Sequence, residues 1–265
     1  MSETGAALFV MWHKTVDRAY FSNFLANFNG DIIFLKAGTR QDSWQRFDAI
    51  SDLSEGDLPD ADLTLQKRGF MAGSMLLNVY ASRLHEQFSH IGFMEYDIHF
   101  PTLRDGHATC ELLNNCMISN EANQVVSLST KRRMHELFAQ EDIRINGINA
   151  VEWLFANLGK PTTPSFEELL ERPAVTQQSF FTSSSHFETV MNPIHKLSVE
   201  RAFESGLDTW HRPSTLFERA IAAQLALTAS SMQVAPTTHS SAQNWSDRPT
   251  RYNWRRYIAN YLRRK

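Results

Sequence analysis

The chain has few cysteines and no long apolar run. Of its 265 residues only Cys110 and Cys116 are cysteines. Two are too few for a disulfide scaffold or a four-cysteine zinc site, so we expect reduced thiols in a cytoplasmic protein. No segment approaches the roughly 20 apolar residues that span a bilayer. The apolar run at residues 6–12 follows no basic stretch and is too short for a signal peptide, so we expect neither secretion by that route nor an integral membrane protein.

Basic residues are scarce over most of the chain and concentrated at its end. The net charge is −3, yet residues 251–265 hold six basic side chains and no acid, which leaves residues 1–250 at −9. Because phosphate binding needs a basic surface, this acidic body argues against a nucleic-acid partner. Hydrophobic residues make up 42 % and charged residues 21 % of the chain, which is typical of a globular domain with a real core.

Short apolar segments alternate with segments of helical periodicity. Buried strands are predicted at residues 7–12, 31–36, 90–100, 125–128 and 178–182. Helices are predicted at residues 20–28, 63–88, 130–138, 149–158, 165–171, 186–203 and 214–227. This alternation indicates an α/β fold with a mixed, mainly parallel sheet flanked by helices. We expect this domain to cover residues 1–227, followed by a Ser-, Thr- and Pro-rich linker over residues 228–250.

Acidic and imidazole side chains lie inside the predicted strand at residues 90–100. In an ideal strand Glu95, Asp97 and His99 share one face. Ligands of α/β sheets bind beyond the carboxyl ends of the strands, and Pro101 ends this one. Carboxylate and imidazole groups suit Mn²⁺ or Mg²⁺, with substrate phosphate completing the coordination shell. The alternative is a strand-end salt bridge or hydrogen-bonded cluster in which His99 is simply satisfied.

The order of these features resembles a known enzyme class. An N-terminal strand with a polar turn, a long helix and a strand ending in Asp97-Ile98-His99 resemble the GT-A class of nucleotide-sugar glycosyltransferases, in the Asp-x-His variant of its Asp-x-Asp motif. Trp210-His211-Arg212, followed by Glu218-Arg219, is similar to the late His and Glu-Arg helix of several bacterial and viral members. The resemblance implies a GT-A-like fold and a metal held by Asp97, His99 and His211. Glu95 is an alternative ligand, because Glu95-Tyr96-Asp97 also fits an acid-x-acid frame.

The resemblance also implies a reaction. A sugar would pass from a nucleoside-diphosphate sugar to a saccharide or lipid-linked acceptor during cell-surface polysaccharide synthesis, in the cytoplasm or at the inner membrane face. The residues implied to bind the nucleotide follow the first two strands or begin the long helix: Trp12, His13, Lys14, Lys36, Lys67 and Arg68. The plain alternatives are a core position for Trp12 and solvated surface positions for the cations.

An inverting transfer requires a base that deprotonates the acceptor hydroxyl. His186 and Glu188 lie at a predicted strand-to-helix junction, where side chains commonly face a ligand, and they are the catalytic candidates. The alternative is that Ser185 caps the helix and Glu188 completes a capping box.

The last fifteen residues combine basic and aromatic side chains. On a helix, one apolar stripe would contain Trp254, Tyr257, Ile258, Tyr261 and Leu262, opposite the arginines. Such a basic amphipathic helix binds anionic membranes; alternatively it docks on the acidic body. Two other functions stay open at this point: a non-enzymatic membrane- or partner-binding adaptor, and a different metal-dependent phosphoryl-transfer or hydrolysis enzyme.

Overall fold

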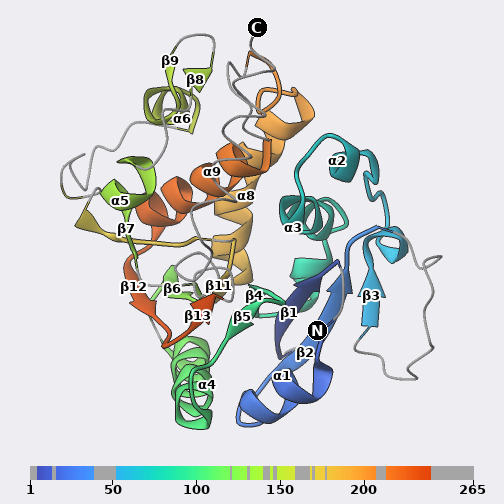
Figure 1. Cartoon of the computed structure of the whole chain (residues 1–265), viewed down its shortest axis with the longest axis vertical. Helices are drawn as coiled ribbons and strands as arrows, with labels where there is room; N and C mark the ends of the chain where they lie inside the picture. The colour runs from blue at the N-terminus through green and yellow to red at the C-terminus, as the bar shows by residue number, and fades with distance from the viewer. Residues whose placement is uncertain are drawn as a thin grey trace, which may run out of the picture.

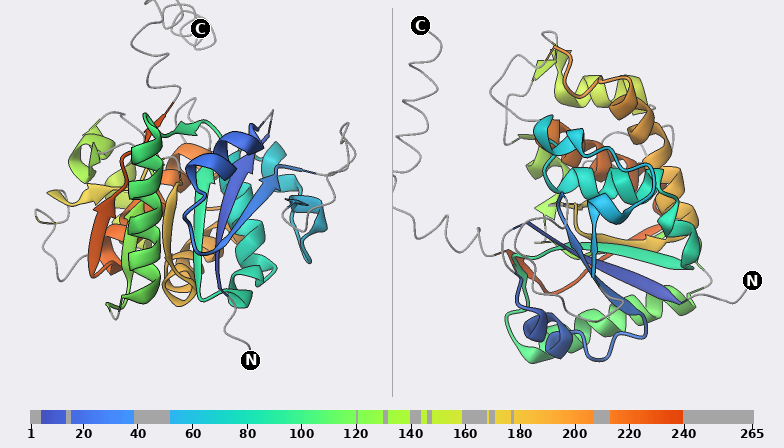
Figure 2. Two further views of the ribbon diagram at one scale, coloured as in Figure 1. Left: turned by 90° about the horizontal axis from the view of Figure 1, so that it is seen from below. Right: turned by 90° about the vertical axis from the view of Figure 1, so that its right-hand side faces the viewer.

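The protein forms three layers, with a sheet between two groups of helices (Figure 1; Figure 2). The computed structural model describes residues 5–13, 16–38, 52–119, 121–129, 132–139, 144–145, 148–158, 168, 171–176, 178–206 and 213–239. Helices α1 (Arg18–Phe24) and α4 (Leu103–Ile118) cover one face of the sheet. Helices α3 (Ala72–Ala81), α8 (Ser184–Val199) and α9 (Pro213–Thr228) cover the other face.

Over the described residues the central sheet has seven strands, in the order β12-β6-β11-β4-β1-β2-β3. The strands are β1 (Ala6–Trp12), β2 (Asp31–Lys36), β3 (Asp52–Ser54), β4 (His90–Glu95), β6 (Gln124–Ser127), β11 (Phe180–Ser183) and β12 (Ser231–Val234). Strand β1 pairs in parallel with β2 and β4, β2 with β3, and β12 with β6. Strand β11 runs antiparallel to β4 and β6. The predicted mixed, mainly parallel sheet with flanking helices is therefore confirmed.

The smaller elements surround this sheet. Two helices, α5 (Met134–Ala139) and α6 (Ala150–Leu158), contact α9, while α2 (Thr64–Lys67) precedes α3. The 3-10 turns are η1 (Glu55–Asp57) and η2 (Leu84–Gln87). Short antiparallel pairs join β5 (Ile98–His99) to β13 (Thr238–His239), β7 (Arg132–Arg133) to β10 (Pro173–Ala174), and β8 (Arg144–Ile145) to β9 (Ile148–Asn149).

Strand β1 is apolar throughout because both of its faces are covered. Phe9 and Met11 point toward α3, α8 and α9, whereas Leu8 and Val10 point toward α1 and α4. Side chains alternate between the two faces of a strand, so a strand buried on both faces must be apolar at every position. This explains why a continuous apolar run, rather than an alternating one, begins the fold.

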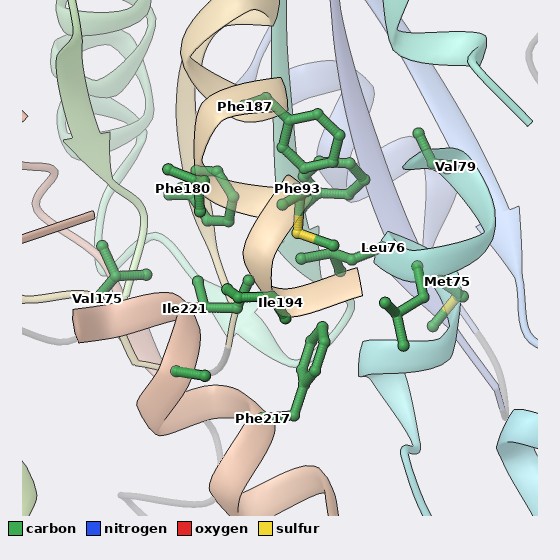
Figure 3. Packing of buried hydrophobic residues seen from close by; sticks show 14 of the residues in the cluster. Met75, Leu76, Val79, Phe93, Val175, Phe180, Phe187, Ile194, Phe217 and Ile221 are labelled. Atoms are coloured by element: carbon green, nitrogen blue, oxygen red, sulfur yellow. The ribbon is translucent and has the colours of Figure 1, made fainter. Parts of the chain in front are cut away.

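Aromatic rings attach the helices to the sheet. Figure 3 shows Phe93 of β4 and Phe180 of β11 beside Phe187 of α8, with Phe217 of α9 further along the same cluster. The ring centroids of Phe93 and Phe187 are 5.2 Å apart, and those of Phe93 and Phe180 are 5.8 Å apart. Large apolar side chains of this kind dominate the energy of a core, so they fix α8 and α9 over the sheet.

The predicted helix over residues 63–88 is wrong as a single element. After α2 the backbone turns through Gly69 (φ +92°) and Met71 (φ +53°), and α3 ends before Arg83 (φ +58°). Positive φ values are incompatible with an α-helix. Apolar spacing carries no information about such breaks, because the side chains on either side still face the same core.

Parts of the predicted linker and helices also differ. Residues 231–239, expected in the linker, form β12 at the edge of the sheet and β13 beside β5. The helix predicted from residue 130 starts at Met134, because residues 132–133 pair with residues 173–174. Most of the predicted helix at 165–171, residues 240–250 of the linker and the amphipathic segment 251–265 lie outside the described residues.

Cys110 and Cys116 lie on α4 as buried free thiols. Burial raises the pKa of Cys116 to about 11, so its thiol stays protonated. None of the helices in the described part of the chain combines the length and the apolar character that crossing a bilayer requires.

Gly92 lies where β4 packs closely against β11, so we expect a larger residue there to destabilise the fold. A Cβ at this position would lie 2.6 Å from Phe181 Cδ2 and 3.1 Å from the Phe180 carbonyl oxygen. We expect Gly92→Ala to lower the free energy of unfolding by about 1–3 kcal/mol, measured by urea denaturation. Gly5→Ala is the control, because nothing lies within 4 Å of its added Cβ. Equal stabilities of the two variants would contradict the described packing.

Candidate functional site

A cavity of about 530 Å³ opens at the carboxyl ends of β1, β2 and β4. This is the edge of an α/β sheet at which ligands usually bind. Its walls also include the starts of α3 and α9, the end of α2 and the residue pair before β11. The lining residues are Met11, His13, Ala37, Gln66, Met71, Ala72, Met75, Glu95, Tyr96, Asp97, Gln178, Ser214, Thr215 and Glu218.

Three carboxylates line this cavity. Glu95 ends β4, Asp97 lies two residues later, and Glu218 comes from the second turn of α9. Burial and the nearby charges of Asp97 and Glu95 raise the pKa of the Tyr96 phenol. The same charges make the cavity attractive to a cation and repellent to an unaccompanied anion.

The expected single face of Glu95, Asp97 and His99 does not form. Strand β4 stops at Glu95, and the chain turns at residues 96–97 before β5 begins. Glu95 and Asp97 line the cavity, but the His99 ring lies edge-on to Tyr20 with centroids 5.6 Å apart. Strand periodicity predicted a shared face only on the assumption that the strand was continuous. The other predicted histidine ligand, His211, lies outside the described residues.

The residues predicted to follow the first two strands separate into two groups. His13 lines the cavity, where its ring is edge-on to Tyr96 at 5.0 Å. Trp12 packs with the α1 and α4 layer instead, and the Lys36 ammonium lies 5.9 Å from the centre of its ring. Lys36 is only 6 % exposed, so it is not the solvated surface lysine of the alternative. Lys14 lies outside the described residues.

Lys67 and Arg68 do not line the cavity. Lys67 is exposed at the end of α2. The Arg68 guanidinium pairs with Glu204 at 2.5 Å and with Asp62 at 3.2 Å, and donates to the Ser198 carbonyl. Its pKa is raised, above all by the hydrogen bond to Glu204. Arg68 therefore joins α2 to the end of α8.

A buried carboxylate supports the wall of the cavity formed by α2 and α3. Glu55 is fully buried and accepts hydrogen bonds from the Gly38 amide, Gln66 Nε2, the Ser74 hydroxyl and Asn78 Nδ2. These donors come from the loop after β2 and from α2 and α3. Multiple donors compensate the cost of burying a carboxylate, so Glu55 links the end of β2 to both helices.

The candidate bases His186 and Glu188 lie at the opposite edge of the sheet. They begin α8 directly after β11, and β11 is antiparallel, so Ser183 pairs with His90 at the start of β4. At about 3.3 Å per residue, the five steps from His90 to Glu95 span roughly 17 Å. Neither side chain lines the cavity. Their assignment as bases required β11 to run parallel to its neighbours, which the sequence does not specify.

His186 and the helix cap have structural roles. The His186 ring is buried, with its nitrogens 2.8 Å from the Thr182 hydroxyl and 2.7 Å from the Thr228 hydroxyl. Burial lowers its pKa to about 4. The N-cap of α8 is Ser183, which accepts from the His186 amide, rather than the predicted Ser185.

Sequence reasoning missed several cavity residues. Gln66, Met71, Gln178, Ser214 and Thr215 carry no local pattern that marks them as functional. They reach the cavity because α2, α3, β11 and α9 converge above the strand ends. Only Glu218 had a signal, the Glu-Arg pair at the start of a helix.

A divalent cation at this cavity would need several oxygen or nitrogen ligands. In the described part of the chain no group of three His, Cys, Asp or Glu residues is arranged to hold a metal ion. Mg²⁺ and similar ions often use only one or two protein carboxylates, because substrate phosphates and water supply the remaining ligands. Glu95 and Asp97 offer two carboxylates at the cavity, the number that a site of this second kind uses.

Comparisons with known proteins gave remote structural similarity only. No family model and no curated protein matches the chain. One similar structure is glucosyl-3-phosphoglycerate synthase from Mycobacterium tuberculosis with Mn²⁺, UDP and glucosyl-3-phosphoglycerate, at 15 % identity and a TM-score of 0.40, covering 99 % of this chain and 80 % of that one. A second structure of the same enzyme, with Mn²⁺, UDP and phosphoglyceric acid, is 14 % identical with a TM-score of 0.40. The match covers 99 % of this chain and 78 % of that one. At this TM-score the likeness supports no conclusion about activity.

The buried state of His186 predicts a pH dependence. Its pKa is near 6.5 in an unfolded chain and about 4 in the folded protein, so the unfolded state binds the proton more strongly. The contribution of His186 to the free energy of unfolding is therefore fully present above about pH 6.5. As the pH falls toward 4, the free energy of unfolding decreases by about 2–3 kcal/mol. We expect His186→Gln to flatten this part of the unfolding free-energy profile. The exposed His107→Gln is the control, and a profile unchanged by His186→Gln would contradict the assignment.

Proposed function

We propose that this chain is a metal-dependent glycosyltransferase, which moves a sugar from a nucleoside-diphosphate sugar to an acceptor hydroxyl. The observation that carries the proposal is the charge of the cavity at the strand ends. Glu95, Asp97 and Glu218 line it, and no Lys or Arg does so among the described residues. A diphosphate binds there only if a cation offsets the carboxylates, so a substrate of this class requires a metal.

Asp97 and Glu95 are the proposed metal ligands, with His211 as a third. His99 is not retained in this set, because its ring packs against Tyr20 instead of facing the cavity. A bound Mn²⁺ or Mg²⁺ would neutralise the diphosphate leaving group as a Lewis acid. The chain's own contribution is to present two carboxylates at the end of a buried strand, where the pairing of β4 with β1 and β11 fixes the backbone.

The nucleotide is proposed to lie at the ends of β1 and β2. His13 and Tyr96 provide a ring pair there, and Met11 and Ala37 provide an apolar surface. An aromatic edge beside an apolar wall suits the face of a base. Lys14 follows His13 directly and remains a proposed contact to the diphosphate. Trp12 and Lys36 support this wall from behind, at neighbouring positions of β1 and β2.

Glu218 replaces His186 and Glu188 as the proposed base. Its carboxylate lines the cavity from α9 and lies 3.5 Å from the Arg219 guanidinium. Glu218 comes from α9, whereas the two proposed metal ligands come from the end of β4 and the turn after it. Because it comes from a different element, we assign it to accept the proton of an acceptor hydroxyl.

The proposed metal dependence is testable by thermal denaturation. UDP and Mn²⁺ are the first probes because both are present in the mycobacterial structures, followed by the other nucleoside diphosphates. Together, at saturation, they are expected to raise the melting temperature by about 5 °C, and neither is expected to do so alone. Asp97→Asn should abolish the joint shift, whereas Glu111→Gln on α4 should leave it intact. Glu218→Gln should keep the shift but lose sugar transfer.

The outcomes separate the alternatives. A wild-type chain that no nucleoside diphosphate stabilises in the presence of Mn²⁺ would overturn the proposed function. Metal-dependent hydrolysis of simple phosphate esters without an acceptor would favour the hydrolase instead.

We further propose that the acceptor is a saccharide or a lipid-linked saccharide in polysaccharide synthesis at an anionic membrane surface. The support for this is the composition of residues 251–265, which combine six basic residues with one apolar stripe. The chain is expected to co-sediment with phosphatidylglycerol vesicles at low salt and to release them at high salt. Replacing Arg255 and Arg256 by Glu should weaken this binding. Vesicle binding that neither high salt nor these substitutions reduce would argue against the membrane role.

A further inference from the structure

Gln178 has a buried acceptor that the protein does not use. The residue borders the cavity and is only 4 % exposed. The amide oxygen Oε1 is buried and makes no hydrogen bond within the described part of the chain. Leaving such an acceptor unsatisfied costs folding free energy. This cost would be recovered when a ligand supplies a donor.

The backbone of Gln178 is also strained. Its φ of +53° lies in the left-handed region, which disfavours residues other than Gly, Asn and Asp. The following residue is fixed on several sides, because the Ser179 hydroxyl accepts from the Glu95 amide at 3.1 Å and the Ser179 carbonyl accepts from the Leu128 amide at 2.9 Å. These contacts hold the strained conformation at the rim of the cavity.

The position of Gln178 indicates which part of a ligand it meets. It precedes β11, which lies beside β4, about 5 Å away. The His13 side of the cavity, at the end of β1, lies on the other side of β4. With the base on the His13 side and the diphosphate at Glu95 and Asp97, the group attached beyond the diphosphate reaches Gln178.

We propose that Gln178 is a specificity-determining residue: when the donor sugar binds, the terminal amide turns so that Oε1, buried in the free protein, faces the cavity and accepts a hydrogen bond from a hydroxyl of the sugar. This inference rests on the proposed function and assigns the sugar-binding side of its cavity. It requires no covalent step. The hydroxyl of the sugar donates, the amide carbonyl accepts, and the buried oxygen that lacks a protein partner becomes satisfied. The residue then discriminates the sugar while leaving the nucleoside diphosphate untouched.

The test compares binding of UDP with binding of UDP-glucose, UDP-galactose and UDP-N-acetylglucosamine by calorimetry, with Mn²⁺ present throughout. Gln178→Met keeps the length of the side chain and removes the acceptor. Gln178→Gly suits the positive φ, so this variant is expected to fold. Both should bind UDP as the wild type does and should bind the preferred UDP-sugar about five- to tenfold more weakly.

Asn123→Gly is the matched control, because Asn123 also has a positive φ (+62°) but borders a different, smaller cavity at the opposite edge of the sheet. It should change neither affinity. Retention of the wild-type preference by Gln178→Met, or equal weakening of UDP and UDP-sugar, would overturn the role of Gln178 while leaving the proposed function intact. Absence of any UDP-sugar that binds more tightly than UDP to the wild type would overturn it as well. Failure of the wild type to bind any nucleoside diphosphate with Mn²⁺ would instead remove the function on which it rests.

Discussion

The parallel pairing of β1 with both β2 and β4 determines where the candidate functional groups lie. Parallel strands end at the same edge, so His13, Ala37 and Glu95 meet around one cavity although they are far apart in sequence. The arrangement requires β1 to be buried on both faces, which its apolar sequence allows. The packing of Phe93 against Phe180 and Phe187 then keeps β4 in position between β1 and β11.

The second constraint is electrostatic. Three carboxylates line the cavity, and among the described residues no lysine or arginine does so. The charge of a ligand therefore decides how well it binds there. Such a charge favours a cation and disfavours an anion that has no accompanying cation. The buried carboxylate of Glu55 behaves differently, because four hydrogen-bond donors surround it. Its role is to hold the α2 and α3 wall, whereas Glu95, Asp97 and Glu218 face the open space.

The sequence predicted the features that depend on local pattern. The apolar runs located β1, β2 and β4, but Glu95 and Asp97 were expected inside a strand that continued to residue 100, whereas β4 ends at Glu95. Features that depend on chain direction or tertiary contact were not predictable. His186 and Glu188 were expected near the strand ends, but the reversed β11 places them at the far edge. Gln178 and Thr215 have no local signal, since only the convergence of separate elements brings them to the cavity.

The reversed direction of β11 has a consequence for variation within this architecture. Beside the carboxylates, the cavity wall includes Gln178, which lies in the connection that enters β11 rather than in one that leaves it. Insertions and deletions in the part of this connection that precedes Gln178 leave the register of β4 unchanged. Homologous chains that act on different molecules should therefore diverge in length at this entrance while their strand β4 stays constant.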